Sequence, residues 1–141
     1  MMIAAVHGQP APKYDPRYSH KYKYRYDERG NLIEEMMHMS NGSIWQRTVR
    51  KFNGNQMEEL IYDENGALNQ KSRYTFDERG NKVEEIMFDP QDGSVKNRYS
   101  YAHEFDSTGN WIKQTTSEWV TKNGRSFFEP TGITYRTIVY Y

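Results

Sequence analysis

Regularly spaced glycines constrain the fold of this 141-residue chain more than any other feature of the sequence. Between positions 30 and 124 a glycine recurs every 12 to 16 residues, and asparagine follows every second one. Several glycines close a stretch of turn-forming residues, as Gly30 does in 27–30 and Gly80 in 77–80. An Asp at the first position of a type I turn accepts hydrogen bonds from the backbone beyond it, and the fourth-position glycine supplies a positive φ. We therefore predict hairpin turns at Gly30, Gly42, Gly54, Gly66, Gly80, Gly93, Gly109 and Gly124, with positive φ at Gly30, Gly66, Gly80 and Gly109.

Between the turns the sequence alternates with period two. In residues 21–26, for example, tyrosine alternates with lysine or arginine. This period is typical of strands that present different residues on their two faces, and helical periodicity is absent. The predicted strands are 20–26, 31–38, 43–52, 55–62, 67–76, 81–88, 94–105, 110–121, 125–129 and 133–141.

Strands that follow one another through tight turns form an antiparallel meander. We therefore predict an all-β fold, an antiparallel β-meander of about ten strands built from hairpin repeats, either rolled into a barrel or left as a strongly twisted sheet. Pro10, Pro12 and Pro16 make residues 1–19 an irregular N-terminal arm, and residues 20–141 form a single β-repeat domain. A hairpin cannot bury a face alone, so stability comes from adding neighbours.

Composition excludes several classes of protein. Nineteen Lys and Arg balance 19 Asp and Glu, which argues against nucleic-acid binding and attachment to anionic membranes. No apolar run approaches the length of a membrane span, so we expect no membrane insertion. Cysteine is absent, which excludes a disulfide framework and thiolate chemistry. The 12 Tyr, 6 Phe and 3 Trp supply enough side-chain area to favour a folded chain.

Two segments carry a resemblance to a known family, and a third is a weaker copy. They are Tyr24-Arg25-Tyr26-Asp27-Glu28-Arg29-Gly30-Asn31, Tyr74-Thr75-Phe76-Asp77-Glu78-Arg79-Gly80-Asn81 and His103-Glu104-Phe105-Asp106-Ser107-Thr108-Gly109-Asn110. These segments resemble the tyrosine-aspartate (YD) repeats of the Rhs-type family of bacterial surface and secreted proteins, over roughly residues 20–115. In that family, long arrays form spiralling β-sheet shells around toxin cargo, or surface modules proposed to bind carbohydrate. The resemblance implies a short array without a toxin domain, an extracellular or cell-surface location, and no catalytic residues.

Strand register follows from the turns if each loop is a simple four-residue turn. One face then carries mostly apolar pairs and is predicted to be buried: Met37–Ile44, Ile61–Leu68, Met87–Val95, Tyr24–Ile33, Tyr74–Val83 and His103–Ile112. The other face carries charge pairs and is predicted to be solvated: Glu34–Arg47, Glu58–Lys71 and Glu84–Arg98. A slip of one residue would place these charges against the core, so they help to set the register.

Adjacent glutamates recur at 34–35, 58–59 and 84–85. The second glutamate of each of these falls on the face predicted to be buried, which also carries the aromatic residues. Glu35, Glu59 and Glu85 are predicted to lie opposite Gln46, Gln70 and Asn97, and Tyr101 opposite Gln114. A recurring carboxylate on a buried face needs hydrogen-bond partners. Two interpretations remain open: a satisfied polar layer, or the lining of a cavity that holds water, a cation or another polar ligand.

No motif points to catalysis. Adjacent glutamates point to opposite faces of a strand and cannot act together as acid and base. His7, His20, His38 and His103 lack metal-ligand spacing, so we expect no metal and no cofactor. The chain is therefore predicted not to be an enzyme.

Aromatic and cationic residues suggest binding instead. Trp45, Trp111 and Trp119 are predicted on the polar face, where they would stack on sugars, form a protein interface or pack under a second layer. The segment 13–25 alternates cations with tyrosines. This pattern suits an anionic polysaccharide or single-stranded nucleic acid, or an edge strand with tyrosines inward.

The C-terminal strand 134–141 has strong β propensity and no acidic residue, so we expect it to be paired with strand 20–26 or covered by a partner. The function predicted from these features is a non-enzymatic structural or interaction module at the cell surface or outside the cell, self-assembling through edge strands. The alternative is a carbohydrate-binding module that uses exposed Trp and Tyr. The expected partners are a second copy or a glycan.

Overall fold

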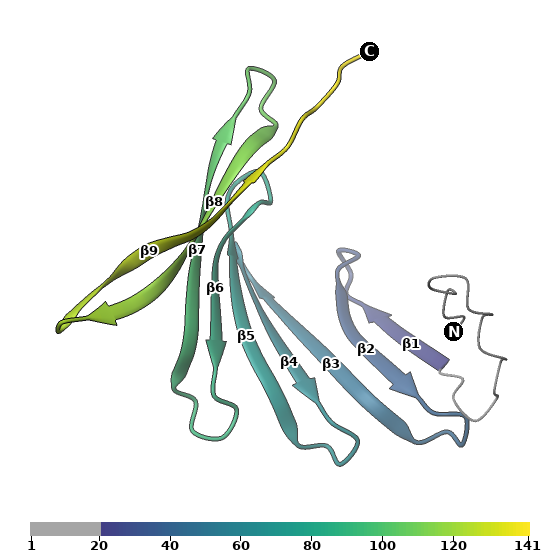
Figure 1. Ribbon diagram of the computed structural model, residues 1–141. Coiled ribbons are helices and arrows are strands. Elements are labelled where there is room, and N and C mark those ends of the chain that lie inside the picture. The colour runs from purple at the N-terminus through teal and green to yellow at the C-terminus, as the bar shows by residue number, and fades with distance from the viewer. Residues whose placement is uncertain (1–20) are drawn as a thin grey trace, which may run out of the picture. The chain divides into compact units, whose positions relative to one another are not determined.

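A computed structural model describes residues 21–141, and every regular element in this range is a β-strand. The nine strands form one antiparallel sheet in which spatial order follows chain order (Figure 1). They are β1 (Lys21–Tyr26), β2 (Leu32–His38), β3 (Ile44–Asn53), β4 (Gln56–Tyr62), β5 (Leu68–Phe76), β6 (Lys82–Phe88), β7 (Val95–Phe105), β8 (Trp111–Lys122) and β9 (Arg125–Tyr135). The predicted all-β meander is confirmed. The predicted arm 1–19 and most of the segment 13–25 lie outside the described residues.

The C-terminal part of the prediction is wrong in two respects. Residues 125–129 and 133–141 were expected as separate strands, but β9 runs along the long strand β8 from Arg125 to Tyr135. A bulge at Thr131 absorbs the interruption next to Pro130. Because β9 pairs with β8 and β1 with β2, these two strands are the edges of the described sheet. The expected pairing of the C-terminal strand with 20–26, and the barrel it would have closed, are therefore wrong.

The chain divides into two compact units. Within the described residues, the first unit comprises 21–50 and 60–69, and the second comprises 51–59 and 70–141. The first unit contains the hairpin β1–β2, and the second contains the strands from β6 to β9. No helix able to cross a membrane occurs within residues 21–141.

The turns form as predicted, because their hydrogen bonds are local. In the first, the Asp27 N–H donates to Asn31 O at 2.9 Å and the Gly30 N–H donates to Asp27 O at 3.1 Å. The Asp27 carboxylate accepts from the N–H groups of Arg29 and Asn31 at 2.9 Å each, and from the Asn31 side-chain amide at 2.9 Å. The bonds from Asn31 lower the pKa of Asp27. All eight turn glycines have φ between 60° and 88°, which confirms the predicted positive φ.

Replacing Gly80 by Ala should lower the free energy of unfolding by about 1 kcal/mol or more, because φ is 82° there and an L-residue is strained in this region. Gly132→Ala is the matched control. A β-carbon at either position would meet no atom within 4 Å, but Gly132 lacks the positive φ. Urea unfolding followed by circular dichroism measures both. Equal losses for the two variants would mean that backbone strain is not the cause.

The predicted register is wrong by two residues in each hairpin for which partners can be compared. Tyr24 lies opposite Glu35 rather than Ile33. The turn closes one residue later than assumed, and the second strand then adds one unpaired residue. The later turn closure and the bulge each shift the pairing by one residue. Because the total shift is two residues, a side chain beyond the bulge stays on the predicted face of the sheet but has a different partner. The same bulge recurs after several turns, and the extra residues are Ile33, Trp45, Val83, Lys96 and Ile112.

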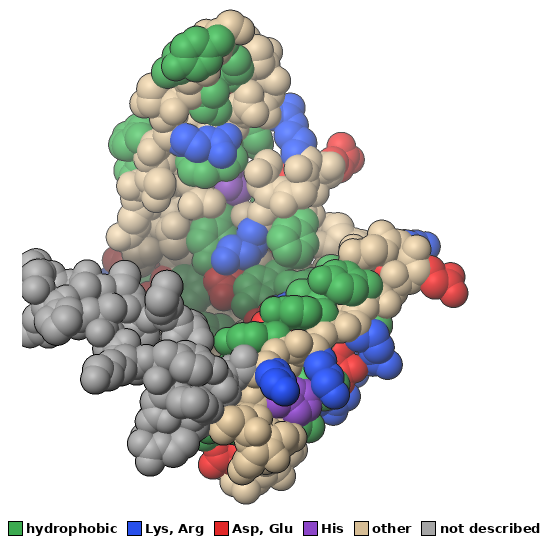
Figure 2. Space-filling model, turned by 90° about the vertical axis from the view of Figure 1, so that its right-hand side faces the viewer, with side chains coloured by type: hydrophobic (Ala, Val, Ile, Leu, Met, Phe, Trp, Pro, Cys, Tyr) green, Lys and Arg blue, Asp and Glu red, His purple; other side chains and the backbone are tan. Residues whose placement is uncertain are grey.

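Burial also differs from the prediction. Among the described residues, Leu60 is the only buried hydrophobic side chain, and the buried polar residues are Glu34, Thr48 and Ser72. Figure 2 shows hydrophobic side chains at the surface next to Lys and Arg side chains. Several residues of the face predicted to be buried are in fact exposed: Tyr24, Ile44, Val95 and Ile112.

Glu34, predicted to be solvated, is the clearest exception. It lies opposite Val49 rather than Arg47, but Arg47 Nε reaches it diagonally at 2.6 Å and Arg25 Nη2 at 2.8 Å. Its side chain is only 9% exposed. The long arginine side chains cover the carboxylate that they pair with, so a charge ladder can also exclude water.

Candidate binding face

One face of the second unit gathers aromatic and hydrogen-bonding side chains from β5, β6, β7 and β8. The register places Tyr74 and Tyr99 on either side of Glu85, and His103 opposite Gln114. All of these side chains are half-buried, so they support one another and still reach the surface. We call this surface the aromatic–polar face and define it as Tyr74, Lys82, Glu85, Tyr99, Tyr101, His103, Trp111 and Gln114.

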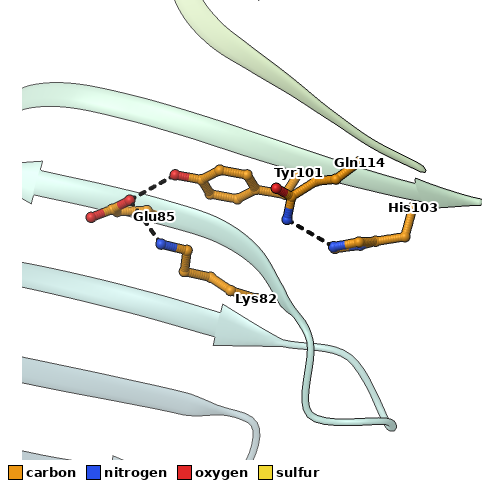
Figure 3. Close-up of polar contacts among 5 residues, drawn as sticks. All are labelled: Lys82, Glu85, Tyr101, His103 and Gln114. Atoms are coloured by element: carbon orange, nitrogen blue, oxygen red, sulfur yellow. Dashed lines mark hydrogen bonds and ion pairs between the residues drawn. The ribbon is translucent and has the colours of Figure 1, made fainter. Parts of the chain in front are cut away.

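Glu85 is the centre of the polar contacts on this face (Figure 3). The Tyr101 hydroxyl donates to Glu85 Oε2 at 2.8 Å, and Lys82 Nζ donates to the same oxygen at 3.2 Å. Burial raises the pKa of Tyr101 well above its ordinary value, and the contact with Glu85 raises it further. Tyr101 is therefore a stable proton donor at neutral pH, and Glu85 Oε2 accepts both hydrogen bonds.

The Lys82 ammonium also lies against two aromatic rings. It is 4.7 Å from the centroid of Tyr101 and 5.4 Å from that of Tyr74. Cation–π attraction and the bond to Glu85 hold the ammonium in place, although its side chain is 35% exposed. A fixed cation with remaining N–H groups can donate to a ligand without a large loss of side-chain entropy.

His103 and Gln114 form a second polar pair on the same face (Figure 3). Gln114 Nε2 lies 3.0 Å from His103 Nε2. Because an amide nitrogen only donates, the His103 nitrogen is the acceptor in this contact. The Trp111 ring packs on His103 with centroids 5.9 Å apart. The Gln114 carbonyl oxygen and the Trp111 ring extend the face beyond Glu85.

This arrangement is suited to binding. Within residues 21–141, no three His, Cys, Asp or Glu side chains gather in a way that could hold a metal ion. The Glu85 carboxylate and the Tyr101 phenol are held by each other, and the raised pKa of Tyr101 keeps the phenol protonated at neutral pH, which makes it a weak nucleophile. What the face offers a ligand is flat aromatic surface with donors and acceptors at fixed positions.

The glutamates predicted as site residues are placed differently from one another. Glu35, in the first unit, lies opposite Tyr24 and Thr48, with Arg50 Nη1 at 3.7 Å. Glu59 is half-buried on β4. The amide partners predicted for Glu35, Glu85 and Tyr101 are wrong. Met37 lies opposite Gln46, Met87 opposite Asn97, and Thr116 opposite Tyr101. Glu85 nevertheless has partners, a tyrosine and a lysine, because the two-residue shift brought Tyr101 within its diagonal reach.

The three tryptophans occupy three different environments. Trp45 is the unpaired bulge residue of β3 and is 46% exposed. Trp119 lies on the side of Arg98, whose guanidinium is 5.5 Å from its ring. Trp111 was predicted on the polar face, but its contact with His103 places it on the aromatic–polar face. The reason is that Trp111 lies between the turn and the bulge at Ile112, where the parity of the strand is reversed.

The C-terminal residues beyond β9 contribute contacts that sequence reasoning missed. In Figure 1 they continue from β9 as an extended segment, drawn in yellow. Arg136 lies over the Trp111 ring at 4.1 Å and donates from Nε to Trp111 O at 3.0 Å. The Tyr140 hydroxyl donates to Asp106 Oδ2 in the turn before β8 and accepts from Asn110 Nδ2 at 2.7 Å. The segment 136–141 therefore supports the Trp111 end of the aromatic–polar face.

Tyr140→Phe should raise the pKa of Asp106, which is now about 2, towards its ordinary value of 3.8. The hydrogen bond from Tyr140 is the largest cause of the lowered pKa, and the variant removes it. Since the folded pKa lies below the unfolded one, this carboxylate stabilises the fold above about pH 4 and loses that effect as the pH falls towards 2. Carboxyl NMR titration measures the change. Asp27, whose pKa depends on its own turn, is the internal control, and an unchanged Asp106 would contradict the assignment.

Comparison with known proteins gives similarity of fold only. No protein-family model and no curated protein matches the sequence. A porin-like protein from Bacteroides uniformis is similar in structure, with a TM-score of 0.58 at 8% identity over 83% of this chain. This chain spans 59% of the length of that protein. A protein of unknown function from Bacteroides fragilis has a TM-score of 0.55 at 9% identity, covering 84% of this chain and 93% of its own. At sequence identities this low, the structural similarity shows a shared β-meander fold and nothing about function.

Proposed function

We propose that this chain is a non-enzymatic interaction module, at the cell surface or outside the cell, whose aromatic–polar face binds carbohydrate. The observation that carries the proposal is the set of Tyr74, Tyr99 and Tyr101 rings near Glu85, with Trp111 beside His103 farther along the same half-buried face. Sugar rings combine apolar C–H faces with hydroxyl groups. They therefore bind to flat aromatic side chains that have hydrogen-bonding groups beside them.

Several polar atoms of this face remain able to meet sugar hydroxyls. Glu85 and Lys82 use only part of their hydrogen-bonding capacity in the contacts between Glu85, Lys82 and Tyr101. Gln114 uses its amide nitrogen on His103 and presents its carbonyl oxygen. The resemblance to YD repeats supports the same assignment and the surface location, since carbohydrate binding is proposed for surface modules of that family.

Glycan-array binding followed by calorimetry tests the proposal. Trp111→Ala should weaken binding of the best glycan at least about tenfold, the equivalent of about 1.4 kcal/mol. Trp45→Ala is the matched control, because this exposed tryptophan belongs to the other unit. Glu85→Gln, which keeps the size of the side chain, should also weaken binding, and circular dichroism establishes that the variants fold. Absence of binding to any glycan, or equal losses for the two tryptophan variants, would overturn the proposal.

A second candidate function is self-association through edge strands. The observation that favours it is that β1 and β9 each pair with only one neighbour among the described strands. Unpaired strand edges can add a strand from another copy, although Pro130 and the bulge at Thr131 limit the regular edge of β9 to 125–129. Sedimentation velocity of the full chain without ligand discriminates the two functions. Stable oligomers would favour self-association, and a monomer at all concentrations would contradict it.

A further inference from the structure

A small cationic hollow lies in the first unit, at the turn between β2 and β3. Its volume is about 300 Å³, and it is lined by Lys21, Lys23, His38, Met39, Ser40 and Gly42. The register places Lys21 directly opposite His38, and Lys23 lies on the same side of β1. Two ammonium groups and an imidazole therefore border a single hollow at the turn between β2 and β3.

The positive charge of this hollow is not neutralised by the described part of the chain. Glu34, the carboxylate on this side of β2, is already paired with Arg25 and Arg47. No carboxylate within residues 21–141 forms an ion pair with Lys21 or Lys23. Several cations on other strands do have a glutamate partner, and these pairs are Lys71–Glu58, Lys82–Glu85, Arg98–Glu84, Lys113–Glu104 and Lys122–Glu129.

His38 adds an independent observation. Its Nδ1 atom is buried and has no hydrogen-bond partner in the described structure. A buried polar atom without a partner is uncommon, because leaving it unsatisfied costs about 1–3 kcal/mol. Functional sites are one of the places where such atoms occur.

We infer that Lys21, Lys23 and His38 form a binding site for an oxyanion, a sulfate or phosphate group. Lysine ammonium groups are strong donors to such groups, and their flexible stems can adjust to a tetrahedral ligand. The volume lies at the small end of the range for ligand sites and suits one charged group with its attached sugar or ester. The group can be a free anion or a substituent of an acidic polysaccharide, and the experiment distinguishes these two sources.

The test is isothermal titration calorimetry of the full chain at constant ionic strength with three probes: inorganic sulfate, inorganic phosphate and a heparin-derived octasaccharide. The double variant Lys21→Gln/Lys23→Gln should raise the dissociation constant at least about tenfold. Lys51→Gln/Lys96→Gln is the matched control, because it removes the same charge from exposed lysines outside the hollow. It should change the constant by less than about twofold. All four lysines are exposed, so the variants should fold, which NMR spectra check.

Each outcome decides the inference. Binding of the inorganic anions identifies a site for the free group, and binding of the octasaccharide alone identifies an acidic polysaccharide. Both outcomes support the site if only the first double variant loses affinity. Equal losses in the two double variants would show a general effect of charge and overturn the inference, as would the absence of binding by any probe. Trp111→Ala should leave this site unchanged, so its result does not depend on the proposed function.

Discussion

Replacing Leu60 by Ala is expected to lower the free energy of unfolding by about 2–4 kcal/mol. Leu60, on β4, is 7% exposed and is the only buried hydrophobic side chain within residues 21–141. The substitution removes apolar area from the interior and leaves a cavity, and few other buried apolar contacts exist to offset the loss. Urea unfolding followed by circular dichroism measures the change.

The control for this prediction is Ile133→Ala on β9. Ile133 is 54% exposed, so its truncation should cost less than about 1 kcal/mol, mostly through lower β propensity. If both variants lost the same free energy, Leu60 would not be a core residue, and the stability of the sheet would come from its hydrogen-bond ladders and charge pairs alone.

Replacing Glu34 by Gln is expected to cost about 2 kcal/mol, because it removes a buried charge that two arginines share. The same substitution at Glu84 should cost about 1 kcal/mol, and at Glu104 less than about 0.5 kcal/mol. The order follows side-chain exposure, which is 9% for Glu34, 27% for Glu84 and 67% for Glu104. All three glutamates have a cation within 4.0 Å, so the series separates burial from the presence of an ion pair.

The measurement for this series is urea unfolding at two salt concentrations. Added salt should reduce the small loss at Glu104 most, since exposed charges are screened and buried ones are not. Equal costs at the three positions would contradict the view that the arginines shield Glu34 from water.

The local parts of the fold were predictable from the sequence. The turn at Asp27 is held by hydrogen bonds that span at most four residues, and Gly30 supplies the backbone conformation that closes it. Such bonds form in almost any context, so turn positions, strand positions and the meander order follow from the chain alone. The similarity to YD repeats concerns the same turn residues and stays a prediction.

The candidate binding face was only partly predictable. The sequence placed Glu85 and Tyr101 on one face, since alternation along a strand is local. It did not indicate their hydrogen bond, which depends on a two-residue register shift. Trp111 was assigned to the wrong face because a bulge reverses its parity. No local signal indicated that the segment 136–141 would reach the turn at Asp106.

For this protein, the sequence by itself determined the all-β class, the turns with left-handed glycines and the chain-order meander, because each depends on interactions among residues close in the chain. Only the tertiary structure decided the register, the burial of Glu34 and the placement of β1 and β9 as the outer strands of the described sheet. The physical reason is that one bulge residue changes every partner beyond it, and burial depends on which long side chains lie across a neighbouring strand.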